Sequence, residues 1–427
     1  MNEELLVEVR IWDQTVGYVV WQPHKGVASF EYVTEFLNKQ LPVAPIQMPL
    51  QEGVFEFPSH ARSDTFKGMP GLLADALPDR FGNELLDAYL LRTGRKLESI
   101  LPTERLLYMG ARGMGALEFE PAKAQSLSAA ERLDMDELVH LAGVVLQQRQ
   151  HLHSSLAETS GLEQIIQVGT SAGGARAKAV IAWNPDTQDV VSGQALAPEG
   201  YSHWLLKFDG VNDQYLSTSE GFGRIEYAYH RMALAAGIEM MECRLLEEQG
   251  RAHFMTRRFD RVEAQQKLHV QTLCALEHFD YNFPGAHSYE QAFATARKLS
   301  LTVHEMEQLF RRAAFNMVAR NQDDHTKNIA FVMDSQGQWF LAPAYDMTFA
   351  YRADSRWVSQ HQMSVNGKRD QFERADLLAL ADAGDIRKPN EIIEQIQEVV
   401  AEWPRFAKDA GVDDIRIKAI QACFRQL

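Results

Sequence analysis

The sequence predicts an α+β protein in which a β-rich half precedes a helical half. Three observations support this fold class. Residues near the start alternate between apolar and polar, as strands do, and strand-like runs separated by turns recur between residues 164 and 259. From about residue 270 the apolar positions instead recur at helical spacing, most clearly in residues 302–320.

The length of 427 residues allows two to three domains with sizeable cores. We expect a small α+β domain in residues 1–125, a β-rich lobe in 126–262 and a helical lobe in 263–427. The net charge of −15 argues against a chain that binds nucleic acid mainly through phosphate contacts. The cysteines are few and widely spaced, so we expect a protein whose cysteines are reduced. No apolar run approaches the length of a membrane span, and the first residues lack a signal-peptide pattern. We therefore expect a cytoplasmic protein.

In the first domain, strands are expected near residues 5–9, 16–21, 28–32 and 53–57, with a turn at Asp13 and Gln14. A helical region follows from residue 71, with a break at Pro78. The β-rich lobe opens with a strand, the glycine-rich turn GTSAGGARAK and a second strand, and its strand signals continue through WLLKFDG. A helix from Gly223 with a stop at Gly237, and a strand pair in 243–246 and 253–259, complete it.

In the helical half, residues 302–320 form one amphipathic helix that leads into the stretch 321–346, NQDDHTKNIAFVMDSQGQWFLAPAYD. Within it Asp323 precedes Asn328 by five positions, and Asp346 arrives after an apparent β-hairpin. In phosphoryl-transfer sites an Asp that receives the hydroxyl proton precedes a Mg²⁺-binding Asn at this spacing, and a second metal-binding Asp follows. The alternative interpretation is a polar turn that closes a hairpin. From residue 375 onwards the chain is expected to be helical.

Two upstream features match the needs of a nucleotide site. The turn that contains Gly173 and Gly174 could expose backbone N–H groups to phosphates, although a plain hairpin turn explains it equally well. Lys207 lies in an apolar strand-like run, where a buried ammonium needs an anionic partner such as a phosphate or Glu226. An edge-strand lysine in water is the alternative. The order of glycine turn, lysine and helix favours the nucleotide site.

Three further groups have open alternatives. His325 could orient the Asp323 carboxylate or cap the turn, and Asp324 is a possible spectator beside it. The cluster RRFDR at residues 257–261 is either the hinge against which adenine stacks or a salt-bridged surface corner.

The motifs SAGGARAK, LLKFDG, RRFDR, NQDDHTKNIAF and PAYDM occur in an order that resembles the HipA family of bacterial serine/threonine kinases, the toxins of HipBA toxin–antitoxin modules. LADALPDRFGN and GMGALEFEP resemble the domain that precedes the kinase core in full-length members, so the resemblance spans nearly the whole chain. It implies a bilobed kinase-like fold with ATP between the lobes. Asp324 stands where glycine is frequent in the family.

The resemblance also implies roles for individual residues. Asp323 would be the catalytic base, Asn328 and Asp346 the Mg²⁺ ligands, and Ser171 a regulatory autophosphorylated serine. A phosphate on Ser171 would repel ATP phosphates from the neighbouring loop. The implied ATP-binding residues are Gly173, Gly174, Ala175, Arg176, Ala177, Lys178, Lys207, Arg257, Arg258, Phe259, His325, Thr326, Lys327, Asn328, Tyr345 and Asp346.

As partners, the resemblance implies a small HipB-type DNA-binding antitoxin and an aminoacyl-tRNA synthetase as protein substrate, with DNA reached only through the antitoxin. Two other functions remain open. One is a small-molecule kinase on a related fold, because the same Asp and Asn would serve it. The other is a non-catalytic repressor or scaffold subunit, against which the presence of Lys207, Asp323, Asn328 and Asp346 speaks.

Overall fold

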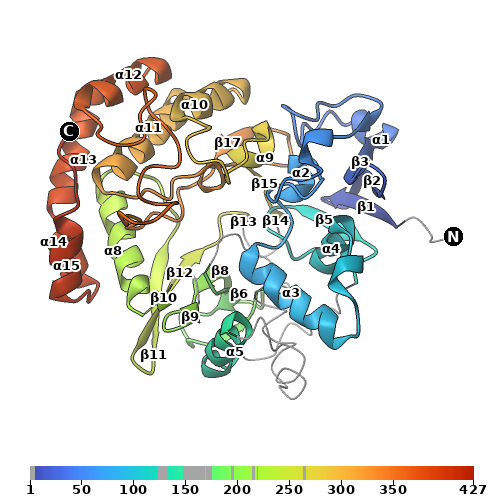
Figure 1. The fold of residues 1–427 in the computed structure, drawn as a ribbon, viewed down its shortest axis with the longest axis horizontal. Coiled ribbons are helices and arrows are strands. Elements are labelled where there is room, and N and C mark those ends of the chain that lie inside the picture. Colours follow the sequence, from blue (N-terminus) through green and yellow to red (C-terminus); the bar gives the residue numbers. More distant parts are fainter. Residues whose placement is uncertain are drawn as a thin grey trace. The chain divides into compact units, whose positions relative to one another are not determined.

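The computed structural model describes residues 5–123, 133–147, 169, 176–193, 197–213, 217–218, 220–262 and 266–427. The chain divides into two compact units. Figure 1 labels the helices and strands and colours them along the sequence. The first comprises Met1–Gly223, Arg244–Val270 and Ser335–Gly337, and the second comprises Arg224–Cys243, Gln271–Asp334 and Gln338–Leu427. The expected division into three domains remains a prediction.

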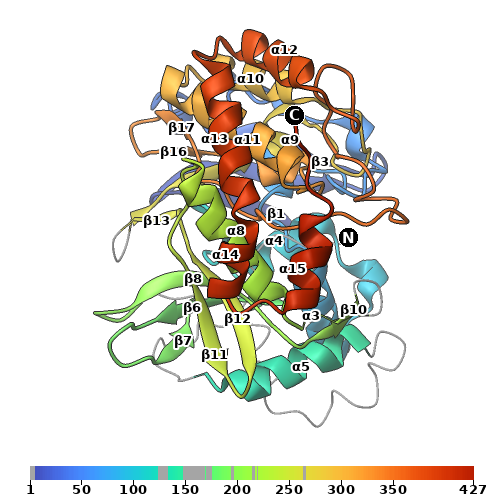
Figure 2. The ribbon, with the colours of Figure 1, turned by 90° about the vertical axis from the view of Figure 1, so that its left-hand side faces the viewer.

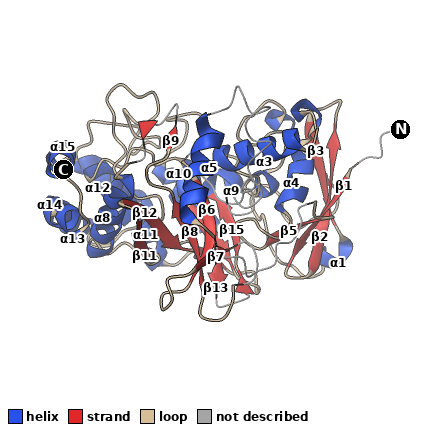
Figure 3. Ribbon diagram, turned by 90° about the horizontal axis from the view of Figure 1, so that it is seen from below, coloured by secondary structure: helices blue, strands red, loops and turns tan. Residues whose placement is uncertain are grey.

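The first unit begins with an antiparallel sheet in the order β4-β3-β2-β1-β5. Its strands β1 to β3 lie side by side in Figure 3, and the alternation of buried and exposed residues in β1 agrees with the sequence pattern. The first hairpin turns at Trp12 and Asp13, which both have positive φ, one residue earlier than expected. The strand bounds are Leu6–Ile11 (β1), Gln14–Gln22 (β2), Val27–Tyr32 (β3), Val54–Phe55 (β4) and Leu117–Glu120 (β5).

Short helices complete this part of the first unit. The expected break at Pro78 is confirmed, because α2 ends before it and α3 begins two residues after it, where Asp79 caps the helix by accepting from the backbone N–H of Gly82. The helices are α1 (Thr34–Leu37), α2 (Gly71–Ala74), α3 (Arg80–Arg92) and α4 (Pro102–Met109), with 3₁₀ turns at Pro58–His60 and Leu97–Ser99.

The second sheet of the first unit has the order β11-β12-β8-β6-β7. Apolar side chains of β6, β8 and β12 pack with those of α3 and α5 into one core cluster, so these two helices cover one face of the sheet. The strands predicted after the glycine-rich turn are confirmed, whereas the strand predicted before that turn lies outside the described residues. The bounds are Met135–Gln147 (α5), Lys178–Trp183 (β6), Val190–Ser192 (β7), Ser202–Lys207 (β8), Cys243–Glu248 (β11) and Arg251–Arg257 (β12). Two small strand pairs are Asn212–Asp213 (β9) with Ser217–Thr218 (β10), and Arg261–Val262 (β13) with Gln266–Lys267 (β14).

The second unit is mainly helical and is built around α11 (Val303–Val318). The helix begins with a capping box between Thr302 and Glu305, and it contacts α10, α12 and α13. The ribbon in Figure 2 shows α13 near it. The predicted helix is therefore confirmed. The other helices are α8 (Phe222–Ala235), α9 (Leu273–Glu277), α10 (Tyr289–Lys298), α12 (Arg374–Gly384), α13 (Pro389–Ala401), α14 (Trp403–Asp409) and α15 (Asp414–Gln421).

Helix α8 ends where expected, because Gly237 takes the positive φ of 75° that stops a helix. After α11 the chain forms the predicted hairpin, β16 (Ala330–Met333) with β17 (Trp339–Leu341), and β15 (His269–Thr272) joins the same sheet in the order β15-β16-β17. Within the described ranges, no helix combines the length and apolar character needed to cross a membrane.

Candidate functional site

The end of α11 leads directly into the loop that carries the predicted catalytic residues. Arg320 leaves the helix with a φ of 56°, and Asn321 then forms a parallel bridge with Ala350. The backbone of Ala350 exchanges hydrogen bonds with Arg320 and Gln322 at 3.1 Å each. The loop therefore starts from a fixed point rather than from a frayed helix end.

Asp323 presents its carboxylate to solvent, with 51% of its side chain exposed. Its backbone carbonyl accepts a hydrogen bond of 2.7 Å from the side-chain nitrogen of Asn328, across the 3₁₀ turn Thr326–Asn328. Because this bond uses the amide nitrogen of Asn328, it orients the amide so that Oδ1 is the atom left for a cation. Oxygen is the ligand atom that Mg²⁺ prefers.

The hairpin returns the chain to this loop at Tyr345 and Asp346. The hydroxyl of Tyr345 donates to the carbonyl of Lys327 at 2.5 Å, and the side chain of Asn321 reaches the carbonyl of Asp346 at 3.5 Å. Asp346 has a φ of 53°, a left-handed conformation that Asp tolerates better than most residues. These contacts hold the segment of Asp346 against the loop of Asp323 and Asn328, as the spacing of the motif predicted.

His325 lies beside Asp323 but beyond hydrogen-bond distance, with its Nε2 atom 3.9 Å from Oδ1 of Asp323. Its side chain does not cap the turn, since the cap position carries no side-chain hydrogen bond. The side chain of Thr326 is buried and donates to the carbonyl of Phe279 at 2.8 Å. The ammonium of Lys327 lies 5.3 Å from the ring centre of Tyr281.

Asp324, the possible spectator beside Asp323, has a buried carboxylate whose two oxygens both make hydrogen bonds. Its Oδ2 atom accepts from the Tyr289 hydroxyl at 2.9 Å and contacts Nδ1 of His361 at 2.8 Å, while Oδ1 accepts from the backbone N–H of Gln362 at 2.8 Å. Burial alone would raise the pKa of Asp324, but the interactions with His361, Gln362 and Tyr289 outweigh it and lower the pKa below its usual value. Asp324 thus anchors the loop while its neighbour Asp323 faces outward.

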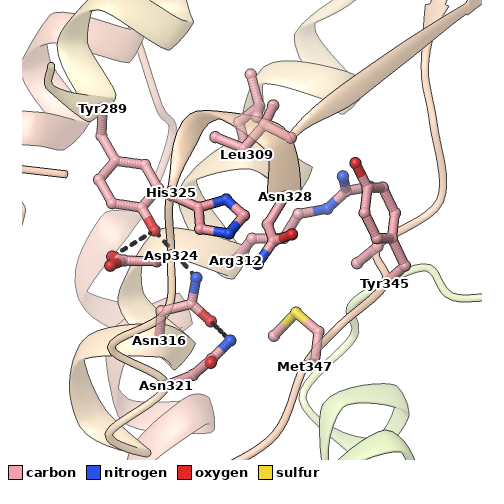
Figure 4. Close-up of a pocket in the computed structure, with 12 residues that line it drawn as sticks. Tyr289, Leu309, Arg312, Asn316, Asn321, Asp324, His325, Asn328, Tyr345 and Met347 are labelled. Carbon is pink, nitrogen blue, oxygen red and sulfur yellow. Dashed lines mark hydrogen bonds between the residues drawn. The ribbon is translucent and has the colours of Figure 1, made fainter. Parts of the chain in front are cut away.

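A small pocket opens behind the loop, and Figure 4 shows the side chains around it. One wall is the hydrogen-bonded series of Asn321, Asn316, Tyr289 and Asp324, drawn there with dashed lines. On another wall the buried Arg312 donates to the carbonyl of Ala342 at 2.8 Å, while its Nε atom has no hydrogen-bond partner. The pocket is lined by Tyr289, Leu309, Arg312, Asn316, Asn321, Asp324, His325, Asn328, Ile329, Ala344, Tyr345 and Met347.

The sequence analysis missed two of these pocket residues, Arg312 and Asn316. With Gln308, which lies outside the pocket, they are buried polar residues spaced four apart on α11, so they form a polar stripe beside the apolar one. The stripe makes hydrogen bonds to Gly237, Ala342 and Tyr289 respectively. Polar residues at this regular spacing inside an apolar helix were the signal in the sequence.

In the first unit, the two predicted nucleotide lysines share one face of the sheet. Lys178 in β6 and Lys207 in β8 are direct cross-strand partners. The ammonium of Lys178 is almost fully buried and lies 3.1 Å from Oδ2 of Asp79, at the start of α3. That of Lys207 lies 5.7 Å from the ring centre of Phe254. Two ammonium groups on one face of a sheet favour an anion beside them.

The neighbouring loop is only partly described. Ser171, Gly173, Gly174 and Ala175 lie outside the described residues. Arg176 stacks on the ring of Phe222 at 4.0 Å, and Ala177 is buried in the core of the sheet.

The cluster at residues 257–261 forms ion pairs, but they are buried rather than at a surface corner. Asp260 is fully buried and pairs with Arg258 at 2.6 Å and Arg261 at 2.5 Å, and it accepts from the backbone N–H of Gly115 at 2.7 Å. Burial would raise the pKa of Asp260, but the two guanidinium groups hold it below its usual range. The backbone N–H of Arg258 donates to the carbonyl of His203 in β8. The predicted hinge segment therefore continues the hydrogen bonding between β8 and β12 past the end of β12.

The predicted site residues therefore fall into two sets. The second unit brings together Asp323, His325, Thr326, Lys327, Asn328, Tyr345 and Asp346. The first unit contains Arg176, Ala177, Lys178, Lys207, Arg257, Arg258 and Phe259.

In the part of the chain that the structure describes, no group of three or more His, Cys, Asp or Glu side chains forms a metal site. The donor set of Asn328 and Asp346 nevertheless suits a hard cation that takes further oxygens from phosphates.

Comparison with protein families gives two matches that together span much of the chain. Residues 7–120 match the model described as HipA N-terminal domain, and residues 170–403 match the HipA-like C-terminal domain. The second model alone covers more than half of the chain.

Individual relatives agree with these matches. A putative kinase, Y4mE of Sinorhizobium fredii, is 27% identical over 193 residues, which are 43% of this chain and 39% of that protein. The chain thus spans well under half of this relative's length. Among solved structures, HipA in the HipA, HipB and operator DNA complex of a toxin–antitoxin system from Shewanella oneidensis matches with a TM-score of 0.67 at 14% identity, over 97% of this chain and 95% of that one. This match confirms the predicted kinase-like α+β fold.

Proposed function

The chain belongs to the HipA family, and we propose that it is an ATP- and Mg²⁺-dependent protein serine/threonine kinase. One observation carries the proposal. The carboxylate of Asp323 is half exposed, and the amide nitrogen of Asn328 is bonded to the backbone carbonyl of Asp323, which supports a base and a metal-ligand oxygen on one held loop. A polar turn that only closed a hairpin would not need an exposed carboxylate on Asp323 together with an oriented amide on Asn328.

In this function Asp323 accepts the proton of the substrate hydroxyl and orients its oxygen toward the γ-phosphate. Asn328 and Asp346 would hold Mg²⁺, which neutralises phosphate charge when bound. Lys207 would pair with the α- and β-phosphates, and residues 173–178 would form the phosphate loop with adenine against the backbone of residues 257–259. Lys178 would join that loop although it also pairs with Asp79.

Regulation and partners follow from the family. We propose autophosphorylation on Ser171, a HipB-like DNA-binding antitoxin as partner, and an aminoacyl-tRNA synthetase as protein substrate. HipA of Shewanella oneidensis was solved with HipB and operator DNA, which supports the antitoxin. The net charge of −15 is compatible with DNA reached through such a partner. The few, widely spaced cysteines support our proposal that the protein works in the cytoplasm.

The proposal is tested with Asp323→Ala and labelled ATP. Loss of a positioned base lowers transfer by about 10²- to 10⁴-fold, while ATP affinity stays within about twofold because Asp323 does not bind the nucleotide. Asp354→Ala is the matched control, since Asp354 is an exposed aspartate that pairs with the exposed Arg352.

The readout is phosphate transferred to the protein itself and to proteins of an extract, with mass spectrometry to locate the modified residue. If Asp323→Ala transferred phosphate at the wild-type rate, the assignment of Asp323 as the catalytic base would be wrong. Label on a small molecule with no labelled protein would replace the protein kinase with a small-molecule kinase. If no label were found at Ser171, the assignment of Ser171 as the autophosphorylation site would be wrong.

A further inference from the structure

A chain of buried hydrogen bonds runs from the candidate catalytic loop to Arg425, in the segment after α15. Asp324 contacts Nδ1 of His361 at 2.8 Å, and Nε2 of His361 lies 2.9 Å from a terminal nitrogen of Arg425. The side chains of Asp324 and His361 are 1% and 0% exposed, and that of Arg425 is 9% exposed. These contacts are therefore largely shielded from water, so removing one partner leaves buried polar groups without the bond they make in the wild type.

The chemistry of the three groups fixes the direction of each bond. Arginine has only donors, so Nε2 of His361 accepts from Arg425. The ring proton then sits on Nδ1, which donates to the carboxylate of Asp324. Arg425 thereby selects the histidine tautomer that can hold Asp324.

Arg425 also holds the other side of the loop. Its second terminal nitrogen donates to Oε1 of Gln322 at 3.1 Å and to Asp370, and its first donates to the carbonyl of Met317 at 2.7 Å. Its backbone N–H donates to the carbonyl of Val318 at 3.0 Å, at the end of α11. A single guanidinium therefore reaches the helix end from which the loop departs.

The two residues that flank Asp323 are thus both tied to Arg425, Gln322 directly and Asp324 through His361. Asp323 itself is half exposed, so its own side chain does little to fix its place. We propose that Arg425 is a positioning residue that orders the loop carrying Asp323 and Asn328. The kinetic part of this proposal rests on the proposed kinase function, whereas the ordering of the loop does not.

The test compares Arg425→Ala and Arg425→Lys with Arg405→Ala in the full chain. Arg425 lies 5.4 Å from the ring centre of Phe372 and pairs with Asp370. Arg405 is the matched control, because it too lies over a phenylalanine ring and pairs with a carboxylate in the second unit but is half exposed. The first readout is amide hydrogen exchange of residues 322–328, with α13 as the internal reference. We expect Arg425→Ala to speed exchange in the loop about tenfold or more, as the loss of charged hydrogen bonds implies, and to leave α13 unchanged.

The second readout separates kcat from nucleotide binding. We expect Arg425→Ala to lower kcat about tenfold or more with ATP affinity changed less than about twofold, since Arg425 contacts neither the base nor the metal ligands. Added guanidinium ion should restore part of kcat in Arg425→Ala and none in Asp323→Ala. Arg425→Lys keeps the positive charge but loses the planar guanidinium with its several donors, so its kcat should lie between those of the wild type and Arg425→Ala.

Loop exchange and kcat equal to those of Arg405→Ala would overturn the proposal. Faster exchange in α13 and the loop alike would also overturn it, because it would show a general loss of stability. If the wild type transfers no phosphate, the kinase function fails, and loop exchange alone then decides the role of Arg425.

Discussion

Two buried aspartates, Asp260 in the first unit and Asp324 in the second, hold the segments that carry candidate site residues in different ways. Asp260 in the first unit is neutralised by the guanidinium groups of Arg258 and Arg261. Asp324 in the second unit receives its hydrogen bonds from a hydroxyl, an imidazole and a backbone N–H. Both carboxylates have a lowered pKa despite their burial.

The difference teaches what each site loses when its carboxylate is removed. Without Asp260, two buried cations would lack their counter-charge, and breaking a buried ion pair in this way is strongly destabilising. Without Asp324, only donors that carry no full charge would be left unsatisfied, which is less costly. The first arrangement therefore depends on charge, and the second depends on the direction of hydrogen bonds.

The largest effect is expected for Asp260→Asn. Leaving Arg258 and Arg261 buried without a carboxylate should lower the free energy of unfolding by about 3–5 kcal/mol. Denaturant unfolding of the full chain measures it, with the exposed Asp354→Asn as control. A loss no greater than that of the control would break the comparison, because it would show that the two cations need no anion.

A smaller effect is expected for Asp324→Asn, which keeps the shape but places an NH₂ group against donors. One or two unsatisfied groups should lower the free energy of unfolding by about 1–3 kcal/mol. The amides of residues 322–328 should exchange faster in this variant than in Asp260→Asn. Equal losses of stability in the two variants would contradict the distinction between charged and neutral partners.

The smallest effect concerns pH. A carboxyl whose pKa is lowered by folding stabilises the protein above its unfolded pKa of about 4, and this contribution disappears as the pH falls through the lower folded value. The free energy of unfolding should therefore fall on going from pH 6 to pH 3, by less in either Asn variant than in the wild type, with a difference of about 1 kcal/mol or more. Parallel curves for the wild type and both variants would show that neither carboxyl contributes to the acid sensitivity.

The sequence alone determined the elements whose signals are local. Alternating residues predicted the N-terminal strands, Pro78 predicted the gap between α2 and α3, and apolar spacing predicted α11. The spacing of Asp323, Asn328 and Asp346 predicted a loop, a hairpin and a return to the loop, and the structure has this order. These features depend on neighbours within a few positions, so the sequence carries them directly.

The tertiary structure decided which of two adjacent aspartates faces the solvent. Asp324 is buried because Tyr289 and His361, which lie 35 and 37 positions away along the chain, donate to it. Arg425, still further along, sets the histidine tautomer. Such contacts join residues without any fixed spacing, and the cost of burying a carboxylate is met only when all of the donors arrive together. Composition and periodicity do not predict which distant residues come together around a carboxylate, because tertiary packing alone decides it.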